Sequence, residues 1–255
     1  MHPDWLRPQG LHQGTRAVMT TRAGGISTGA YASMNLGAYV GDEPDRVQSN
    51  MQTLAEALGA QPVFLKQVHG RRVVRLESLA SREPGVEEAD ASVTTTPGLA
   101  CAVTIADCLP VLFSAPNGRA VGAAHAGWRG LAAGVLEACA AEVCEAAACE
   151  PDGLRAWLGA SIGPQAFEVG ADVLQAFGVA PDQPGPHFQP KPAGLDGQPR
   201  WWAHLPGLAR LRLQALGVEA VTGGGTCTFS DASRFFSFRR DRVCGRMAAA
   251  ICLDA

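Results

Sequence analysis

Three residues that lie far apart in the chain, His69, Cys108 and His125, have the side chains of a metal site. Each lies at or just after the end of an apolar run that is typical of a strand, among turn-forming or polar residues. Two imidazoles and one thiolate are the protein ligands of an open tetrahedral zinc site, which keeps a fourth position for water or substrate. The same side chains also suit a metal-free site in which Cys108 is a nucleophile and a histidine is its base.

The elements that must position these residues are predicted strands that end in turns. Strands over Val63–Val68, Leu99–Ile105 and Ala120–Ala124 end beside the three residues. Pro110 fixes the chain just after Cys108, so the thiol is expected on a defined bend.

A glycine-flanked turn follows His125 and carries Arg129, and a helix is predicted over Leu131–Glu145. The N-terminus of a helix offers free N–H groups and a positive dipole end, which suit an anion. Since a guanidinium can bind phosphate through two hydrogen bonds, this turn is a predicted phosphate site. The alternative is an ordinary strand–turn–helix junction with a solvated Arg129.

The remaining pattern alternates between short strands and amphipathic helices. Further strands are predicted over Arg16–Thr21, Arg72–Leu76, Ala91–Thr95, Val111–Ser114, Arg155–Leu158, Val218–Thr222 and Arg246–Leu253, and helices over Asp45–Leu58, Ala171–Phe177 and His204–Leu216. Pro116-Asn117-Gly118 is predicted to form a hairpin turn, and the proline-rich segment Pro181–Pro199 a long surface loop or flap. Because no repeat or linker divides the chain, we expect residues 1–255 to form one mixed α/β domain.

Composition excludes several classes of function. The net charge is −3 and no basic cluster occurs, which argues against binding to nucleic acid or to anionic lipid. The first residues lack the features of a secretory signal, and no apolar stretch is long enough to span a membrane. The eight Cys include no C-x-x-C pair and are expected to be free thiols, which fits a cytoplasmic protein.

Several sequence blocks resemble those of the laccase-domain family, also called polyphenol-oxidase-like or YfiH-like, whose members are described as purine nucleoside phosphorylases. The blocks are Met19–Gly25, Ser33–Gly37, Lys66–Gly70, Thr104–Pro110, Ala124–Gly130, Ile162–Pro164, Phe167–Gly170, Thr226–Thr228 and Phe235–Met247. The resemblance spans nearly the whole chain. Two departures are Phe238, where the family often has Tyr, and His204, where Asp is common.

The resemblance implies a fold, a cofactor and an activity. The implied fold is a single layered domain of the mixed α/β (α+β) class, with β-sheets flanked by helices. The implied cofactor is a zinc ion bound by His69, Cys108 and His125. The implied reaction is the phosphorolysis of adenosine, inosine and methylthioadenosine, with inorganic phosphate as co-substrate and adenosine deamination as a side activity.

Phosphorolysis requires residues that hold phosphate and nucleoside. Arginines are the expected phosphate ligands because of their forked donors, and Arg246 is a further one in the chain. The candidate substrate and phosphate residues are Arg22, Asn35, Gln67, Asp107, Arg129, Arg239 and Arg240.

Three other functions stay open at this level. A metal-free cysteine hydrolase would cleave an amide such as that of a peptidoglycan precursor. A multicopper oxidase would need many more imidazoles than the six His present, although a single copper bound by His₂Cys is compatible with the residues. A non-enzymatic binding module is the least favoured, since an open metal site would serve no purpose in it.

Overall fold

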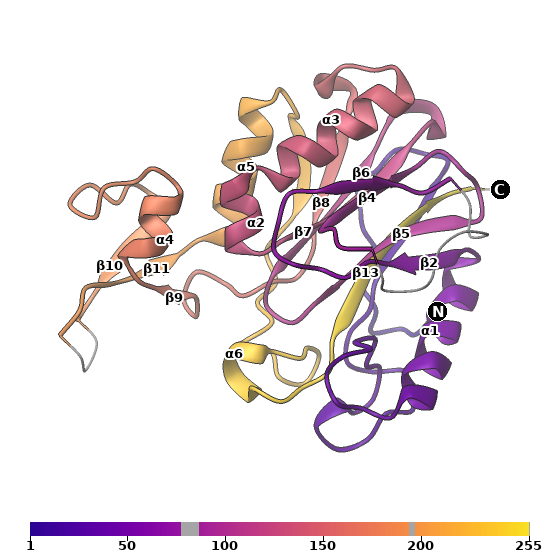
Figure 1. Ribbon diagram of the computed structural model, residues 1–255, viewed down its shortest axis with the longest axis horizontal. Helices are drawn as coiled ribbons and strands as arrows, with labels where there is room; N and C mark the ends of the chain where they lie inside the picture. Colours follow the sequence, from indigo (N-terminus) through magenta and orange to yellow (C-terminus); the bar gives the residue numbers. More distant parts are fainter. Residues whose placement is uncertain (78–86, 194–196, 255) are drawn as a thin grey trace.

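Two β-sheets packed face to face, with helices on both outer faces, form the body of the molecule (Figure 1). The computed structural model describes residues 1–77, 87–193 and 197–254. The larger sheet has the order β12-β8-β6-β7-β4-β3 and the smaller one the order β1-β13-β5-β2. A third sheet, β10-β11-β9, lies with helix α4 in a lobe that projects from the body, at the left of Figure 1. The predicted mixed α/β fold with helix-flanked sheets is confirmed, whereas the assignment to one domain stays a prediction.

The elements are short and come from all parts of the chain. The strands of the larger sheet are β3 (Val73–Arg75), β4 (Ala91–Thr94), β6 (Leu109–Ser114), β7 (Val121–Ala126), β8 (Arg155–Leu158) and β12 (Ala220–Gly223). Those of the smaller sheet are β1 (Thr15–Met19), β2 (Gln61–Phe64), β5 (Leu99–Ile105) and β13 (Met247–Leu253), and those of the lobe are β9 (Glu168–Val169), β10 (Phe188–Lys191) and β11 (Arg200–Ala203). The α-helices are α1 (Pro44–Leu58), α2 (Trp128–Ala133), α3 (Val135–Ala147), α4 (Ala171–Ala176), α5 (Leu205–Ala215) and α6 (Phe238–Asp241). Short 3₁₀ turns occupy Gly29–Tyr31, Pro116–Gly118 and Pro151–Gly153.

The layers follow from strands that are apolar on both faces. In β6, Val111 and Phe113 belong to the core beneath the helices, while Leu112 belongs to the core between the two sheets. In β5, Val103 faces the other sheet and Ala102 packs toward α1. Since successive side chains of a strand point to opposite faces, a continuous apolar run places a strand in the middle of a layered structure.

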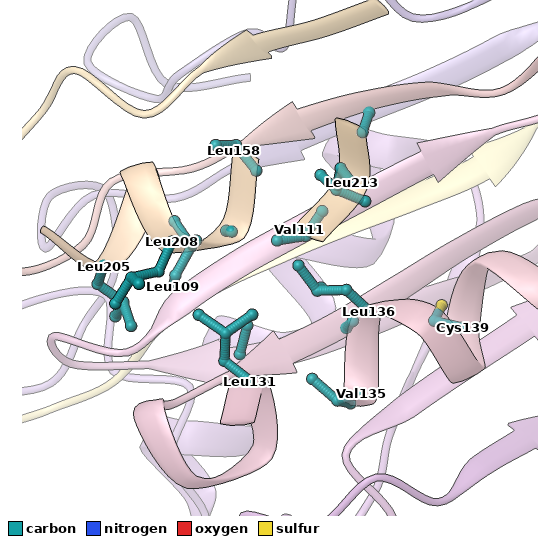
Figure 2. Packing of buried hydrophobic residues seen from close by; sticks show 14 of the residues in the cluster. Leu109, Val111, Leu131, Val135, Leu136, Cys139, Leu158, Leu205, Leu208 and Leu213 are labelled. Carbon is teal, nitrogen blue, oxygen red and sulfur yellow. The ribbon is translucent and has the colours of Figure 1, made fainter. Parts of the chain in front are cut away.

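The helical layer is held by branched aliphatic side chains. Figure 2 shows leucines and valines of α2, α3 and α5 against Leu109 and Val111 of β6 and Leu158 of β8. All the side chains labelled in Figure 2 are at most 6% exposed. Burial of one such side chain is worth roughly 1.5–3 kcal/mol, so this interface fixes the strands whose ends carry the candidate site.

Most predicted elements are present, with shifted ends, and three predictions need correction. The predicted helix Leu131–Glu145 is two helices, α2 and α3, because Gly134 between them has a φ of 93°. The predicted strand Val63–Val68 stops at Phe64, after which the chain leaves β5. The predicted surface loop Pro181–Pro199 contains β10, which pairs antiparallel with β11; its residues 194–196 lie outside the described ranges. Across the described part of the chain, no helix has the length and apolar character needed to cross a membrane.

Gly134 yields a prediction about stability. A residue with a side chain is strained in this left-handed conformation, by about 1–2 kcal/mol. We expect Gly134→Ala to lower the free energy of unfolding by that amount, measured by urea denaturation. Gly225 lies outside the left-handed region, and a methyl group on its Cα would meet open space, so Gly225→Ala is the control and should be close to neutral. Equal stability of Gly134→Ala and the unchanged protein would contradict this account.

Candidate active site

His69, Cys108 and His125 converge on one point, as the sequence predicts. Their candidate ligand atoms all lie within 4.8 Å of one another. The Cys108 Sγ lies 3.9 Å from the His69 Nε2, and the two imidazole rings are edge to face with centroids 4.8 Å apart. His125 is buried, Cys108 is partly exposed and His69 is exposed. One side of the cluster is therefore open to a ligand.

Three separate segments deliver these side chains. His125 lies in β7, opposite Pro110 of β6, while Cys108 occupies the tight connection from β5 to β6. Asp107, just before Cys108, has a φ of 95°, which turns the chain sharply at this point. His69 also has a positive φ, 60°, and lies beyond the end of β2 in a segment without regular strand structure.

Asp90 fixes two of the three ligands. Its buried carboxylate accepts hydrogen bonds from the backbone N–H groups of Val68 (3.1 Å), His69 (2.9 Å) and Gly70 (2.7 Å). The Asp90 Oδ1 also lies 2.8 Å from the Nδ1 of His125. A histidine held through Nδ1 turns its Nε2 toward the cluster, which is the usual way in which a carboxylate orients a metal-binding imidazole.

The sequence analysis missed Asp90. It stands after two glutamates, in Glu87-Glu88-Ala89-Asp90, where nothing distinguishes it from a solvated acidic run. Its one sequence signal is its place directly before the apolar strand β4, which favours burial of this carboxylate over that of its neighbours.

The electrostatics favour a charged cluster. Burial by itself would raise the pKa of the Cys108 thiol, but His125 and His69 beside it lower this pKa to about 6. Burial likewise opposes the charged form of His125, yet Cys108 and Asp90 raise its pKa to about 9. Burial would also raise the pKa of Asp90, and the hydrogen bonds from His125 and the backbone N–H groups outweigh it and lower the value. At neutral pH the cluster therefore holds a thiolate.

The residues fit a metal ion. Thiolate and imidazole are ligands that zinc and other borderline-soft cations prefer. Gly127 packs directly against the cluster, since a Cβ there would lie 2.9 Å from the Cδ2 of His69 and 3.0 Å from the Sγ of Cys108. Among the described residues, these three form the one group of three or more His, Cys, Asp or Glu side chains with this geometry.

The cluster lies in one pocket and borders a second one through Cys108. The larger pocket has a volume of about 990 Å³ and contains all three residues, together with Gln67, Arg246 and several apolar side chains. The smaller one has a volume of about 200 Å³ and is lined by Asp107, Arg239 and mostly apolar residues such as Phe167. Cys108 and Phe238 line both pockets.

Three of the predicted substrate residues line these pockets. Gln67 lies in the larger pocket, where its amide exchanges hydrogen bonds with Thr104. Asp107 and Arg239 lie in the smaller pocket, and the Asp107 carboxylate accepts a hydrogen bond from the Arg239 backbone N–H at 2.7 Å. The Arg239 guanidinium stands over the ring of Phe167.

The other four predicted residues lie outside the described lining of both pockets. Asn35 is buried and hydrogen-bonds to Asp42. The guanidinium of Arg22 donates to the carbonyls of Ala32 and Ala232, and that of Arg240 donates to the carbonyls of Thr228, Phe229 and Phe235.

Arg129 lies inside α2 rather than in the predicted turn, and its guanidinium stacks on the Trp128 ring at 4.3 Å. Gly127 is the N-cap of that helix, which has only six residues.

Comparison with known proteins defines the family. The family model described as multi-copper polyphenol oxidoreductase laccase matches residues 16–254. The chain belongs to this family. A relative from Pseudomonas aeruginosa strain PAO1, named a purine nucleoside phosphorylase, is 47% identical over 99% of this chain and 97% of its own length. The purine nucleoside phosphorylase YfiH of Escherichia coli K12 is 45% identical, over 98% of this chain and 97% of its own.

Two solved structures share the fold of this chain. A Neisseria meningitidis protein superposes with a TM-score of 0.87 at 42% identity and covers 99% of this chain and 100% of its own. YlmD from Geobacillus stearothermophilus gives a TM-score of 0.85 at 31% identity, over 98% of this chain and 96% of its own.

The position of Asp90 predicts its effect on metal binding in this laccase-family chain. Asp90→Asn removes the negative charge and places an amide N–H₂ against backbone N–H donors. We expect the affinity of the His69–Cys108–His125 site for added Zn²⁺ to fall by about 10–100-fold, measured by calorimetry. The exposed residue Asp182 provides the control variant Asp182→Asn. Unchanged affinity in Asp90→Asn would show that the carboxylate does not orient the ligands.

The lowered pKa of Cys108 predicts its reactivity in metal-depleted protein. Because the thiolate is the nucleophile, alkylation by iodoacetamide should accelerate with pH and reach half its maximal rate at about pH 6. Mass spectrometry of the modified peptide measures this rate. Cys144, a partly exposed thiol whose pKa is raised to about 12, is the internal control and should react slowly at neutral pH. A Cys108 profile centred near pH 8.5, the value of a free thiol, would contradict the proposed cluster of charges.

Proposed function

We propose that this protein is a purine nucleoside phosphorylase, a transferase that moves the ribosyl group of a nucleoside from its base to phosphate. The observation that carries the proposal is the His69–Cys108–His125 cluster in the larger pocket, in a chain with near full-length relatives that bear this name. The finer proposal is that adenosine, inosine and methylthioadenosine are substrates and that adenosine is also slowly deaminated.

We propose zinc as the metal, held by His69, Cys108 and His125. When bound there, zinc supplies a Lewis acid that polarises an oxygen or nitrogen atom of the substrate. The protein's own contribution is orientation, because Asp90 fixes His125 and the backbone around His69. A cytoplasmic location belongs to the same proposal and is supported by eight cysteines that are all free thiols.

The pockets match the demands of phosphorolysis. An oxygen of hydrogen phosphate attacks C1′ of the ribose while the C1′–N9 bond breaks. The bond's electron pair goes to the purine, and the proton of the hydrogen phosphate ends on the released base. Ligand pockets have volumes of about 300–1,000 Å³, so the larger pocket has room for nucleoside and phosphate together.

Arg246 is the proposed phosphate ligand in the larger pocket, and Arg239 in the smaller pocket is the alternative. Both are partly exposed arginines at pockets that contain Cys108. A guanidinium offers two parallel donors to phosphate oxygens and stabilises the negative charge that the attacking group carries. Phe238, which lines both pockets, offers an aromatic surface for the flat purine.

The test is product analysis with and without phosphate. Consumption of adenosine or inosine should require phosphate and yield ribose 1-phosphate together with the free base. Cys108→Ala should lower turnover by at least about a hundredfold without unfolding the protein, because a ligand or nucleophile is lost rather than core volume. Cys139→Ala removes a buried thiol from α3, outside both pockets, and is the matched control.

Either of two results would contradict the proposed phosphorylase activity and indicate another function. Free ribose formed equally fast without phosphate would indicate a nucleosidase. No conversion of nucleosides, combined with hydrolysis of an amide, would indicate a cysteine hydrolase.

The cysteine hydrolase is the second candidate because Cys108, His125 and Asp90 have the order of a nucleophile, a base and its orienting carboxylate. Its substrate would be an amide such as that of a peptidoglycan precursor. Trapping of a thioester on Cys108, in protein treated with a chelator, would favour this candidate. A multicopper oxidase is less favoured, since within the described ranges the protein offers a single group of three such ligands.

A further inference from the structure

A second pair of histidines, His187 and His204, faces one small space at the base of the projecting lobe. His187 comes just before β10, and His204 comes just after β11 and is the N-cap residue of α5. The backbone N–H of His204 donates to the carbonyl of His187 at 2.8 Å, which extends the antiparallel pairing of Phe188 with Ala203 by one more residue pair. Residues directly opposite in such a pair have side chains on the same face of the sheet.

The two imidazoles point at the same location above Gly207. A Cβ on Gly207 would lie 2.6 Å from the Nδ1 of His187 and 2.7 Å from the Nδ1 of His204. The ring centroids are 5.9 Å apart and the rings are inclined at 63°. In the first turn of a helix the Cβ direction tilts toward the N-terminus, so glycine at this position keeps the space between the two nitrogens free.

One of the two nitrogens lacks a partner in the protein. The Nδ1 of His187 is buried and has no hydrogen bond. Burial lowers the pKa of His204, and His187 and Arg210 lower it further. A buried polar atom without a partner calls for an explanation, and a neutral imidazole nitrogen is a common metal ligand.

We propose that His187 and His204 bind a transition-metal cation of the Zn²⁺, Ni²⁺ or Cu²⁺ class through their Nδ1 atoms, at a site separate from the His69–Cys108–His125 cluster. A cation bound between the two nitrogens, on the side away from the Gly207 backbone, would need zinc–nitrogen distances of about 2.0–2.1 Å, which a small rotation of the two rings can provide. Water molecules complete the coordination sphere, as they do in sites with few protein ligands.

The site ties the lobe to the body. His187 belongs to the lobe, whereas His204 begins α5, which packs on the larger sheet. The neighbouring Leu205 lines the smaller pocket, and Phe167, which lines it too, accepts a hydrogen bond from Ala203 through its carbonyl. A cation on the histidine pair would therefore steady one wall of the smaller pocket without touching the reacting groups.

The experiment is the stoichiometry of Zn²⁺ binding, measured by calorimetry on metal-depleted protein. We expect about two Zn²⁺ per chain in the unchanged protein and about one in His187→Gln and in His204→Gln. Cys108→Ala combined with His125→Ala should keep the ion on the histidine pair, so this result does not depend on the proposed enzymatic activity. His12→Gln is the control and should leave the stoichiometry unchanged, since His12 bonds to the carbonyl of Gly153 elsewhere.

Gly207→Ala is a second variant that keeps both histidines and fills the space between them. It should weaken Zn²⁺ binding at the pair by at least tenfold, and the far-ultraviolet circular dichroism of metal-depleted samples checks that each variant is folded. Ni²⁺ should raise the melting temperature of the Cys108→Ala/His125→Ala protein, and this rise should vanish when His187 is also replaced. No Zn²⁺ bound by the folded Cys108→Ala/His125→Ala protein, or equal binding by folded His187→Gln, would overturn the proposal.

Discussion

The buried carboxylate of Asp90 is the interaction on which the geometry of the candidate site depends. It accepts three backbone N–H groups from the segment Val68–Gly70 and holds the ring of His125. That segment has no strand partner of its own, so these hydrogen bonds take the place of a ladder. A carboxylate that accepts several N–H groups keeps its charge even when it is buried, because the hydrogen bonds favour the ionised form. One side chain thus positions a histidine from a loop and a histidine from a strand.

Close backbone packing completes this arrangement. A Cβ on Gly130 would lie 2.8 Å from the carbonyl oxygen of Gly70, so α2 and the His69 segment approach more closely than side chains would allow. Gly127 gives the same freedom beside the thiol of Cys108. The layered core fixes the strands, and these glycines let the connecting loops meet above them. The site therefore combines rigid strand ends with loops that are held by a few specific contacts.

Apolar periodicity and turn residues were enough to predict most strands of the two larger sheets. Leu99–Ile105 and Arg155–Leu158 have the predicted bounds, because an apolar run flanked by turn residues has few other structures available. The convergence of His69, Cys108 and His125 was predictable from residue type and from the family resemblance together.

What escaped prediction depends on contacts between distant segments. Asp90 positions the site through its hydrogen bonds to the Val68–Gly70 backbone, and no local sequence pattern indicates this contact. The strand β10 contains Pro190, a residue that disfavours strands, and forms because β11 pairs with it at the edge of its sheet. Among the arginines, local sequence pointed to Arg129 beside its glycines, whereas the larger pocket contains Arg246, which arrives from the far end of the chain.

The charges of the cluster determine how a metal ion would compete for it. With the pKa of Cys108 at about 6 and that of His125 at about 9, a neutral solution leaves a thiolate facing an imidazolium. The sulfur is then ready to bind a cation, while His125 must first release its proton. Metal binding at neutral pH therefore releases about one proton per site. The affinity for metal rises with pH until the metal-free protein itself has lost the His125 proton.

Asp90 has opposite effects on the loss of this proton and on the binding of the cation. Its charge favours the imidazolium form of His125, whereas its hydrogen bond holds the ring in the orientation that a metal requires. The same carboxylate, which is fully buried, thus stabilises the site without metal and holds His125 in the orientation that metal binding needs.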